Sequence, residues 1–516
     1  MAAVAVTAEV PAQARRVPVT AGEVLPRWVR LAGRSVLGVQ LLGMLAFSTL
    51  QYQRFALTKD FAAYSQAWWA IGHGRLDPYS TVFGVSFWRS DAEFAMWPLS
   101  LLSHVYPHAV TLLWVQDVAV VVTELVAFAW IVKVIERRPG AVSRRTGPLL
   151  AFGAVVVLVI EPWVYDTIAF DFHFEAIAAL FCVLVGYDLW SGRTRRLWLW
   201  VPLALISNAL GGVYLVGVGI SGVLAGRRTR RWGLAVAAVG LTWVVVLSTF
   251  AGVGLGEHLG SSYGYLLGPH HGRAGLFAIV VGALGHPGAV AHMVVSHGLV
   301  IFDFLVVVGA IGVVSPWGCG MAVVVLVPNA LDASGLFVRT AASFQTWPAL
   351  PFVLIGSVMV LVRLLEGEAR SRRVALDVAV AWAALLGVLA VLVMTAFGGD
   401  WLSVDPATAA ALSHVESVVP SNAEVICSQG VVGRFGLRDS VYAFTEGHQT
   451  LPVDRRVVVF VLAPEQGIDD VLPDHEATVA VRFVESRHAT RVLYARSHVY
   501  AVEWTPPPGT RQVTLP

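Results

Sequence analysis

Long apolar segments separated by short polar turns make up most of the chain. They lie near residues 35–51, 109–133, 147–165, 172–190, 196–208, 212–226, 232–254, 288–313, 316–329, 346–364 and 374–397. An apolar stretch of about 20 residues is long enough to cross the hydrocarbon core of a bilayer as a helix. The pattern therefore predicts an all-α polytopic membrane bundle of about eleven transmembrane helices. The segments at 196–208, 212–226 and 316–329 are short for a full crossing.

Basic residues favour one orientation of this bundle. They gather in the loops 27–34, 133–145, 193–196, 227–231 and 363–373. Lys and Arg are in excess on the cytoplasmic side of membrane proteins, so we place these loops and the N-terminus in the cytoplasm of a multi-pass plasma-membrane protein. Residues 1–34 are then a disordered cytoplasmic tail, and residues 35–397 form the transmembrane domain. The segments expected outside are loop 52–108, turn 166–171, segment 255–287, turn 330–345 and residues 398–516.

Residues 398–516 have a different character from the spans. Short β-rich runs at 456–462, 478–483 and 491–494 alternate there with turn residues and charges. A segment of a little over 100 residues can form its own core. We predict a small C-terminal α/β domain outside the membrane.

Composition agrees with a membrane protein and limits its partners. Of the 516 residues, 56% are hydrophobic and 14% are charged, whereas soluble domains average about 25% charged residues. The lipid bilayer is therefore an expected partner. The net charge is +2, and no basic patch with interleaved aromatic residues occurs, which argues against binding of nucleic acid. Three cysteines provide no disulfide framework.

Asp60 is the first candidate for chemistry, because it opens the long outer loop just after the first span. Ionisable groups at membrane level are costly and often functional. A surface ion pair with Lys59, of little energetic weight, is the alternative. The residues that follow have apolar and aromatic side chains at helical spacing, which predicts an amphipathic helix on the outer side. In this helix Trp68 is either an interface-belt aromatic or a platform for stacking a sugar.

The second outer turn contributes Asp171, His173 and Glu175 at the start of an apolar helix. The helix dipole favours negative charge there, so Asp171 is either an N-cap or part of a pocket wall that faces the first loop. For His173, which lies among phenylalanines, we favour the pocket wall. Asp60, Asp171 and His173 together have the donor atoms to ligate a hard divalent ion, and the sequence leaves metal dependence open.

Two other turns carry polar candidates. Arg339 lies in the last outer turn, where it either holds a phosphate by bidentate hydrogen bonds or contacts lipid headgroups. Asn208 lies at the apex of the short hairpin 196–226, where a capping or turn role is expected. Walker A and H-E-x-x-H motifs are absent from the sequence, so the chemistries that these motifs carry are not expected.

Several stretches of the chain resemble one family of membrane proteins. The stretches are 60–68, 171–175, 328–330 with 344–348, and 418–425 with 436–444. In their order and in the layout of spans, outer loop and outer domain, they resemble the glycosyltransferase C (GT-C) superfamily. Within it the chain is similar to a bacterial family of predicted membrane proteins of unknown function (DUF2079), common in actinobacteria.

The resemblance implies transfer of a sugar from a polyprenyl-phosphate donor to a cell-envelope glycan or protein on the outer face. Asp60 would be the general base, Asp171 and His173 would orient the acceptor or the donor phosphate, and Arg339 would hold that phosphate. A groove between spans would take the polyprenyl tail. Other residues expected to bind substrate are Gln66, Trp68, Glu175, Asn208 and Gln345.

The chain also departs from the family at two places. Family members often carry Lys-Glu-Asp where this chain has Ser207-Asn208-Ala209, and His-Tyr where it has Phe344-Gln345. These differences keep a non-catalytic envelope scaffold, or a protein that binds lipid-linked glycan, as an alternative. A lipid or small-molecule transporter is a second alternative, although the sequence shows no repeat symmetry of the kind that carriers often have.

Overall fold

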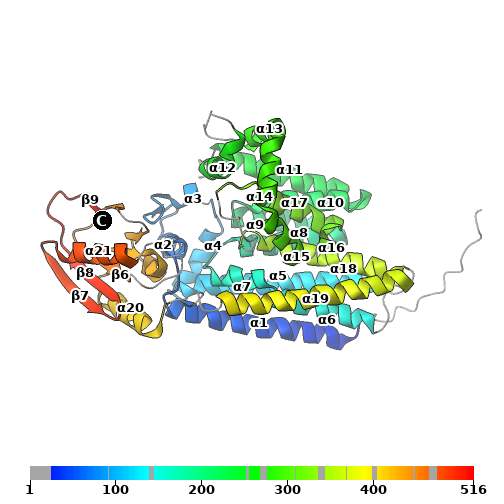
Figure 1. The fold of residues 1–516 in the computed structure, drawn as a ribbon, viewed down its shortest axis with the longest axis horizontal. Coiled ribbons are helices and arrows are strands. Elements are labelled where there is room, and N and C mark those ends of the chain that lie inside the picture. Colours follow the sequence, from blue (N-terminus) through cyan, green and yellow to red (C-terminus); the bar gives the residue numbers. More distant parts are fainter. Residues whose placement is uncertain are drawn as a thin grey trace, which may run out of the picture.

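A helical bundle and a smaller domain with a β-sheet at one end make up the protein (Figure 1). The computed structural model describes residues 25–90, 92–138, 145–250, 255–267, 276–307, 310–334, 343–367, 369–397, 402, 404–445, 448–463 and 474–516. The predicted tail 1–34 is therefore described only from residue 25. The first helix, α1, begins at Arg27, so it includes residues that the sequence pattern assigned to the tail.

Helices cover each of the predicted apolar segments within the described residues. They are α1 (Arg27–Gln53), α5 (Val110–Glu136), α6 (Thr146–Ile160), α7 (Pro162–Ala169), α8 (Glu175–Ser191), α9 (Leu197–Ser207), α10 (Gly211–Leu224), α11 (Arg227–Phe250), α14 (Pro287–Ser296), α15 (Gly298–Val307), α16 (Ala310–Val313), α17 (Pro316–Leu331), α18 (Leu350–Glu366) and α19 (Ala369–Phe397).

Fewer helices than predicted are long enough to be counted as full spans. In the described part of the chain, five are long and apolar enough to cross a membrane, or up to six if a bent pair forms one span. The hairpin of α9 and α10 illustrates the difference. With 11 residues, α9 rises only about 17 Å, roughly half the thickness of the hydrocarbon core. The number of eleven crossings therefore stays a prediction.

The segment predicted as one span over 288–313 is divided into several helices. The chain bends by 95° between α13 (Leu276–Gly285) and α14. Pro287 lies at this break, where it fixes φ and has no N–H to continue the preceding helix. A second break at His297 separates α14 from α15. Segment 255–287, predicted to be an outer loop, also contains α12 (Leu255–Tyr263) and the short η3 (Gly264–Leu266).

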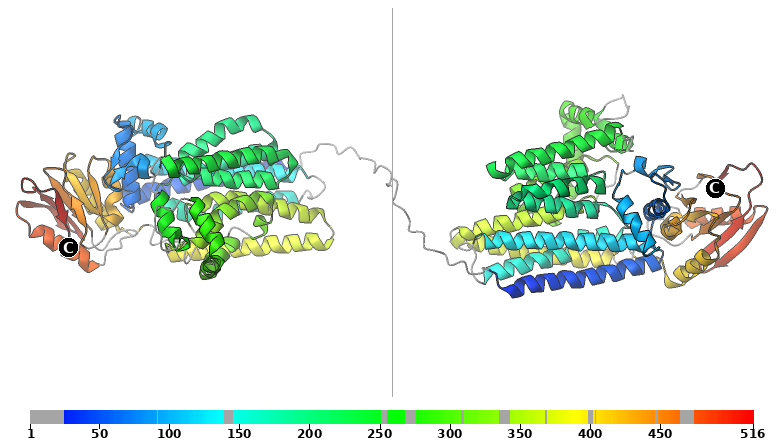
Figure 2. Two further views of the ribbon diagram at one scale, coloured as in Figure 1. Left: turned by 90° about the horizontal axis from the view of Figure 1, so that it is seen from above. Right: turned by 180° about the vertical axis from the view of Figure 1, so that it is seen from behind.

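Two groups of helices pack side by side in the bundle. One consists of α1, α5, α6, α18 and α19, and the other is built on α8 to α11 and α17, with α5 against α8 between them (Figure 2). Small residues bring α10 and α17 close together, since a Cβ atom at Gly320 would lie 2.3 Å from the carbonyl oxygen of Gly217. Such close backbone approach is typical of helix pairs in membranes.

Polar side chains join α1 to α5 inside the bundle. Ser48 donates a hydrogen bond to Asp117 at 3.1 Å, and Gln40 donates one to Glu124 at 3.3 Å. All four side chains are buried. Interhelical hydrogen bonds of this kind help to hold membrane helices together, which gives these two intramembrane acids a role in packing.

Loop 52–108, which the sequence predicted to lie outside, has its own short elements. They are α2 (Lys59–Gly72), β1 (Tyr79–Ser80), β2 (Val85–Ser86), α3 (Phe87–Ser90), α4 (Met96–Ser100) and η1 (Leu101–His104). The predicted helix after Asp60 is confirmed as α2. The predicted division of α2 into an exposed polar face and a buried apolar face is not observed. Ser65 and Gln66 are as buried as the apolar residues of this helix.

The C-terminal domain covers the other side of α2. Its elements are α20 (Pro406–Val418), β3 (Glu424–Ser428), η6 (Gln429–Gly436), β4 (Val441–Phe444), β5 (Thr450–Pro452), β6 (Val458–Leu462), α21 (Asp474–Glu485), β7 (Thr490–Arg496), β8 (Val499–Trp504) and β9 (Gln512–Thr514). The main sheet has the strand order β4-β3-β6-β8-β7, with β3 parallel to β4 and β6, and β8 antiparallel to β6 and β7.

Both faces of this sheet are buried, as the fully buried strands β3 and β6 require. Val425 and Cys427 point to the side covered by α20 and η6, whereas Ile426 points to the side covered by α21. An α/β domain is thus confirmed. The run 478–483, predicted as a strand, lies in the helix α21. There Ala480, Val481 and Val484 are buried at helical spacing, so packing on the sheet overrides the strand preference of valine.

Two glycines of η6 let the C-terminal domain approach α2 closely. A Cβ atom at Gly436 would lie 2.6 Å from the backbone oxygen of Ala62, and one at Gly433 would lie 2.8 Å from that of Leu57. Backbone atoms cannot move aside as a flexible side chain can. A larger residue at either glycine would therefore push the C-terminal domain away from the start of α2.

We expect Gly436→Ala to destabilise the protein by about 1–3 kcal/mol, the usual cost of overpacking, and to loosen the C-terminal domain. Thermal unfolding in detergent and limited proteolysis of the full chain measure both effects. Gly387→Ala in α19 is the matched control, because a Cβ atom there meets no atom within 4 Å. Equal behaviour of the two variants would contradict the close contact.

Candidate functional site

Thr58 connects the two predicted catalytic aspartates. It caps the N-terminus of α2, where its hydroxyl accepts from the backbone N–H of Asp60 at 3.4 Å. Its own hydroxyl and N–H donate to Oδ2 of Asp171 at 2.5 and 3.0 Å. Asp171 is buried, and Asp60, in the first turn of α2, is partly exposed. The structure therefore brings Asp60 and Asp171 together although they lie in separate stretches of the sequence.

Two glutamines fix the turn between α7 and α8 that carries Asp171. From α1, Gln51 donates to the carbonyl of Ala169 at 2.5 Å. From α5, Gln116 donates to the carbonyl of Asp171 at 2.8 Å and accepts from the N–H of His173 at 2.6 Å. Asp171 has a φ of 131°, in a region that residues other than glycine rarely adopt. The surrounding hydrogen bonds thus hold a strained backbone in place.

Burial and a neighbouring charge change the protonation of Asp171. Burial raises the pKa of its carboxyl well above the usual range, and the nearby Asp60 raises this pKa further, while the hydrogen bonds from Thr58 oppose both effects. Two carboxylates close together do not both ionise readily. Asp171 therefore tends to hold its proton, and Asp60 is the more exposed acid of the pair.

His173 is buried among aromatic rings and is neutral. Its ring stacks on Phe344 with centroids 3.6 Å apart, and Tyr64 approaches it edge-on at 5.9 Å. Burial lowers the pKa of His173 to about 3, so the imidazole provides no positive charge for a phosphate. Its Nε2 atom is buried and has no hydrogen-bond partner among the residues that the structure describes. Such an unsatisfied group in a native structure calls for an explanation, and a bound ligand is one.

A buried acid stands beside the hairpin apex. Asn208 donates to Oε1 of Glu93 at 2.9 Å, and the hydroxyl of Tyr64 lies 3.5 Å from the same oxygen. Asn208 also accepts from the N–H of Leu210 at 2.7 Å, a turn contact that agrees with the predicted capping or turn role. Glu93 and Asn208 are 2% and 3% exposed. Tyr64 thus links this acid to His173.

The other predicted residues differ in their surroundings. Glu175 is buried, with Oε2 4.0 Å from Nδ1 of His173. Gln345 accepts a hydrogen bond from Tyr214 through its backbone carbonyl. Trp68 is buried in the core, and its indole donates to the carbonyl of Leu99 at 2.9 Å. Arg339 lies outside the described residues.

Gln66 bridges the outer loop and the C-terminal domain. Its amide nitrogen donates to Oγ1 of Thr81 and to the carbonyls of Arg438 and Asp439, and its oxygen accepts from the N–H of Thr81. These contacts give Gln66 a role in holding α2 against the domain. Its role in substrate binding stays a prediction.

Four residues of this site, Gln51, Thr58, Glu93 and Gln116, were not assigned a role from the sequence. Thr58 had a local signal, because a threonine directly before an apolar helical pattern is a typical N-cap. Glu93 had only its place in the polar outer loop. Gln116 lies inside a predicted span, and no sequence pattern indicates that it reaches the turn at Asp171.

No group of three or more His, Cys, Asp or Glu side chains with the arrangement of a metal site occurs among the described residues. The set of Asp60, Asp171 and His173 is accordingly not assembled as a metal centre in this part of the chain. The pair His270 and His271 lies outside the described residues.

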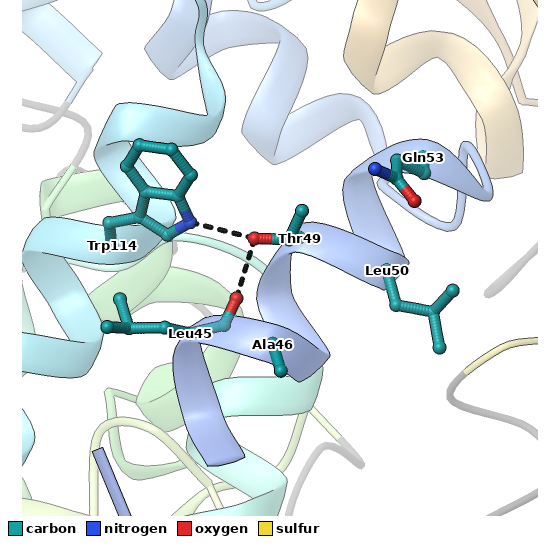
Figure 3. A pocket seen from close by; sticks show the side chains of 6 residues that line it. All are labelled: Leu45, Ala46, Thr49, Leu50, Gln53 and Trp114. Atoms are coloured by element: carbon teal, nitrogen blue, oxygen red, sulfur yellow. Dashed lines mark hydrogen bonds between the residues drawn. The ribbon is translucent and has the colours of Figure 1, made fainter. Parts of the chain in front are cut away.

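An apolar groove runs along α1 towards this site. It measures about 650 Å³ and is lined by Leu45, Ala46, Thr49, Leu50, Gln53 and Trp114 (Figure 3). The indole of Trp114 donates to the hydroxyl of Thr49 at 3.0 Å, and Thr49 donates to the carbonyl of Leu45 at 2.6 Å. The hydroxyl of Thr49 and the indole N–H of Trp114 are thereby satisfied. Gln53, the last residue of α1, is the lining residue nearest in sequence to Thr58.

The strained backbone at Asp171 predicts an unusual order of stability between two variants. Asp171→Gly and Asp171→Ala lose the same carboxylate, but only glycine adopts a φ of 131° without strain. We expect Asp171→Gly to be more stable than Asp171→Ala by about 1–3 kcal/mol, as measured by thermal unfolding in detergent. An alanine variant of equal or greater stability would show that the turn is not strained.

The interaction of the two aspartates predicts a shift in titration. Asp60→Asn removes one cause of the raised pKa of Asp171, so the buried carboxyl should lose its proton at a lower pH than in the wild type. Infrared difference spectra of the carboxyl stretch, with Asp171→Asn to assign the band, measure this midpoint. Asp77→Asn is the control, because Asp77 is an exposed acid of the same loop. An unchanged midpoint in Asp60→Asn would refute the coupling.

Comparison with known proteins places the chain in a family. No protein of curated function matches it in sequence. Among solved structures, the crystal structure of ArnT from Cupriavidus metallidurans bound to undecaprenyl phosphate is similar with a TM-score of 0.46 and 14% sequence identity, over 91% of this chain and 98% of that chain. The sequence model of the family described as "Predicted membrane protein (DUF2079)" matches residues 51–471, and the chain therefore belongs to this family of membrane proteins.

Proposed function

We propose that the protein is a membrane glycosyltransferase that transfers a sugar from a polyprenyl-phosphate donor to a cell-envelope acceptor on the outer face. The main support for the proposal is that residues from separate family-like stretches of the sequence lie close together in the structure. Asp60, Asp171, His173 and Phe344 come from three of those stretches, and they meet at the end of the bundle next to the C-terminal domain.

In this proposal Asp60 is the general base. An acceptor hydroxyl oxygen attacks the anomeric carbon of the donor, the bond from that carbon to the phosphate oxygen breaks, and the hydroxyl proton moves to the Asp60 carboxylate. Polyprenyl phosphate is the leaving group. Asp60 suits this role because it is the partly exposed member of the pair, so the acceptor can reach it. Fixed positioning of the reactants would supply much of the rate.

The protonation of the neighbours supports the same assignment. A donor phosphate is an anion, and a cluster of ionised carboxylates would repel it. The raised pKa of Asp171 reduces that repulsion, and the protonated carboxyl can donate a hydrogen bond. His173 is neutral and offers the unsatisfied Nε2 atom as a donor or an acceptor. The positive charge for the phosphate is then assigned to Arg339, as the sequence suggested.

Glu93 is a further member of the proposed site. Its carboxylate lies against Asn208, at the hairpin where family members often carry acidic residues and this chain does not. We assign it to the sugar hydroxyls, because the oxygens of a carboxyl group can accept hydrogen bonds from hydroxyls. The groove on α1 is suited to the polyprenyl tail, since its lining is mostly apolar and lies on the last turns of α1, the helix that leads to Thr58.

A non-catalytic scaffold that binds lipid-linked glycan is the second candidate function. The observation in its favour is the replacement of the family's Lys-Glu-Asp by Ser207-Asn208-Ala209. Under that function the same residues would bind the glycan without turnover. A transporter remains the third candidate, and substrate flux in proteoliposomes would identify it.

The test is transfer of radiolabelled sugar in membranes supplied with a panel of polyprenyl-phosphate sugars. We expect Asp60→Asn to lower the rate by about 10²–10⁴-fold, the usual contribution of a general base, while donor binding persists. Asp77→Asn should keep the wild-type rate. Full activity of Asp60→Asn would rule out this mechanism. Donor binding by folded wild-type protein without transfer from any donor would favour the scaffold.

A further inference from the structure

A small cavity with an arginine rim lies at the opposite end of the bundle from the proposed active site. It measures about 200 Å³ and is formed where α5, α8 and α18 end. Its lining consists of Val134, Arg137, Arg138, Trp190, Met359, Val362 and Arg363. The proposed function uses none of these residues.

The three arginines of the rim differ in whether a carboxylate neutralises their charge. Arg138 forms an ion pair with Glu366, with its Nη1 atom 2.9 and 3.1 Å from the two carboxylate oxygens. Arg137 lies over the ring of Trp190, with Cζ 3.7 Å from the ring centroid. Neither Arg137 nor Arg363 has a carboxylate partner in the described part of the chain. The cavity therefore keeps an excess of positive charge.

The dipoles of the surrounding helices would not stabilise an anion bound in this cavity. α5, α8 and α18 all end here, and the C-terminus of a helix carries roughly half a negative charge. These carbonyl ends favour the arginines and disfavour an anion. Binding of an anion therefore depends on the guanidinium groups, which can form bidentate hydrogen bonds with phosphate oxygens. The stacking on Trp190 holds one of them in a fixed orientation.

The apolar part of the lining indicates what else the ligand contains. Val134 and Val362 are buried and Met359 is partly buried, so the floor of the cavity is hydrophobic beneath a charged rim. α5 and α18 are both long and apolar enough to span the membrane, and the cavity lies at the ends of these spans, at the level of lipid headgroups. A basic pocket between helices at this level is suited to an anionic lipid.

We propose that this cavity binds the phosphodiester headgroup of an anionic phospholipid, with Arg137 and Arg363 on the phosphate oxygens and the acyl chains against the apolar lining. By the distribution of basic loops, the lipid belongs to the cytoplasmic leaflet. It is distinct from the polyprenyl donor, and its binding does not depend on the proposed transfer reaction.

Native mass spectrometry of the full chain in detergent, titrated with phosphatidylglycerol or phosphatidylcholine, tests the proposal. We expect the wild type to prefer phosphatidylglycerol. The double variant Arg137→Gln with Arg363→Gln should bind it about 25-fold more weakly, because each arginine near an anionic lipid contributes about fivefold. The single variant Arg363→Gln should lose about fivefold, and it leaves the stacking of Arg137 on Trp190 intact.

The matched control is Arg195→Gln with Arg196→Gln. These exposed arginines lie just beyond the end of α8 and do not line the cavity, so the variant removes the same charge from the same end. It should keep wild-type binding. Equal losses in both double variants, or no loss in either, would overturn the site. Displacement of the lipid by millimolar inorganic phosphate would overturn the assignment to a lipid and indicate a site for free phosphate.

Discussion

The hydrogen bonds of the turn between α7 and α8 are the constraint on which the candidate site depends. The turn leaves backbone N–H and C=O groups at the end of an apolar bundle, where little water is available to satisfy them. Gln51 and Gln116 satisfy these groups from two neighbouring helices. Because the amides fix the backbone, they also fix the positions of Asp171 and His173. Thr58 then couples Asp171 to α2, and α2 carries Asp60.

Burial sets the charges of this site more than ion pairing does. Asp171 has a hydroxyl and an N–H from Thr58 as partners instead of a cation, and burial together with Asp60 raises its pKa. Burial also keeps His173 neutral. Glu93 has an amide and a phenol as neighbours. These residues therefore carry little positive charge of their own. Within the proposed function, the positive charge that binds an anionic donor would have to come from groups outside this buried set.

The sequence predicted the elements better than the contacts between them. Apolar segments and helical spacing identified the bundle and α2, because these features are local and periodic. The spans near 196–226 and 288–313 were less well predicted, because short apolar helices and breaks at residues such as Pro287 depend on packing within the bundle. The helix at 478–483 was missed for the same reason. Its valines favour a strand locally, but packing of this segment on the sheet of the C-terminal domain stabilises a helix. Asp60 and Asp171 could be singled out as polar residues in unusual places. That they share Thr58, and that Gln116 holds the turn, are long-range facts that no local pattern contains.

Within the proposed function, the C-terminal domain would limit how substrates approach. It covers α2 through Gly433, Gly436 and Gln66, so this helix is enclosed on both sides. Within the proposed function, Asp171, His173 and Glu93 are then too deeply buried to meet an acceptor first, whereas Asp60 keeps part of its surface open. A lipid tail has a different route, along the apolar groove on α1. The two substrates would thus arrive from different directions, the acceptor from the side of the outer loop and the donor from the bilayer, and they would meet at the start of α2. Such an arrangement separates a water-soluble acceptor from a membrane-bound donor until both are in place, which suits a transfer reaction at a membrane surface.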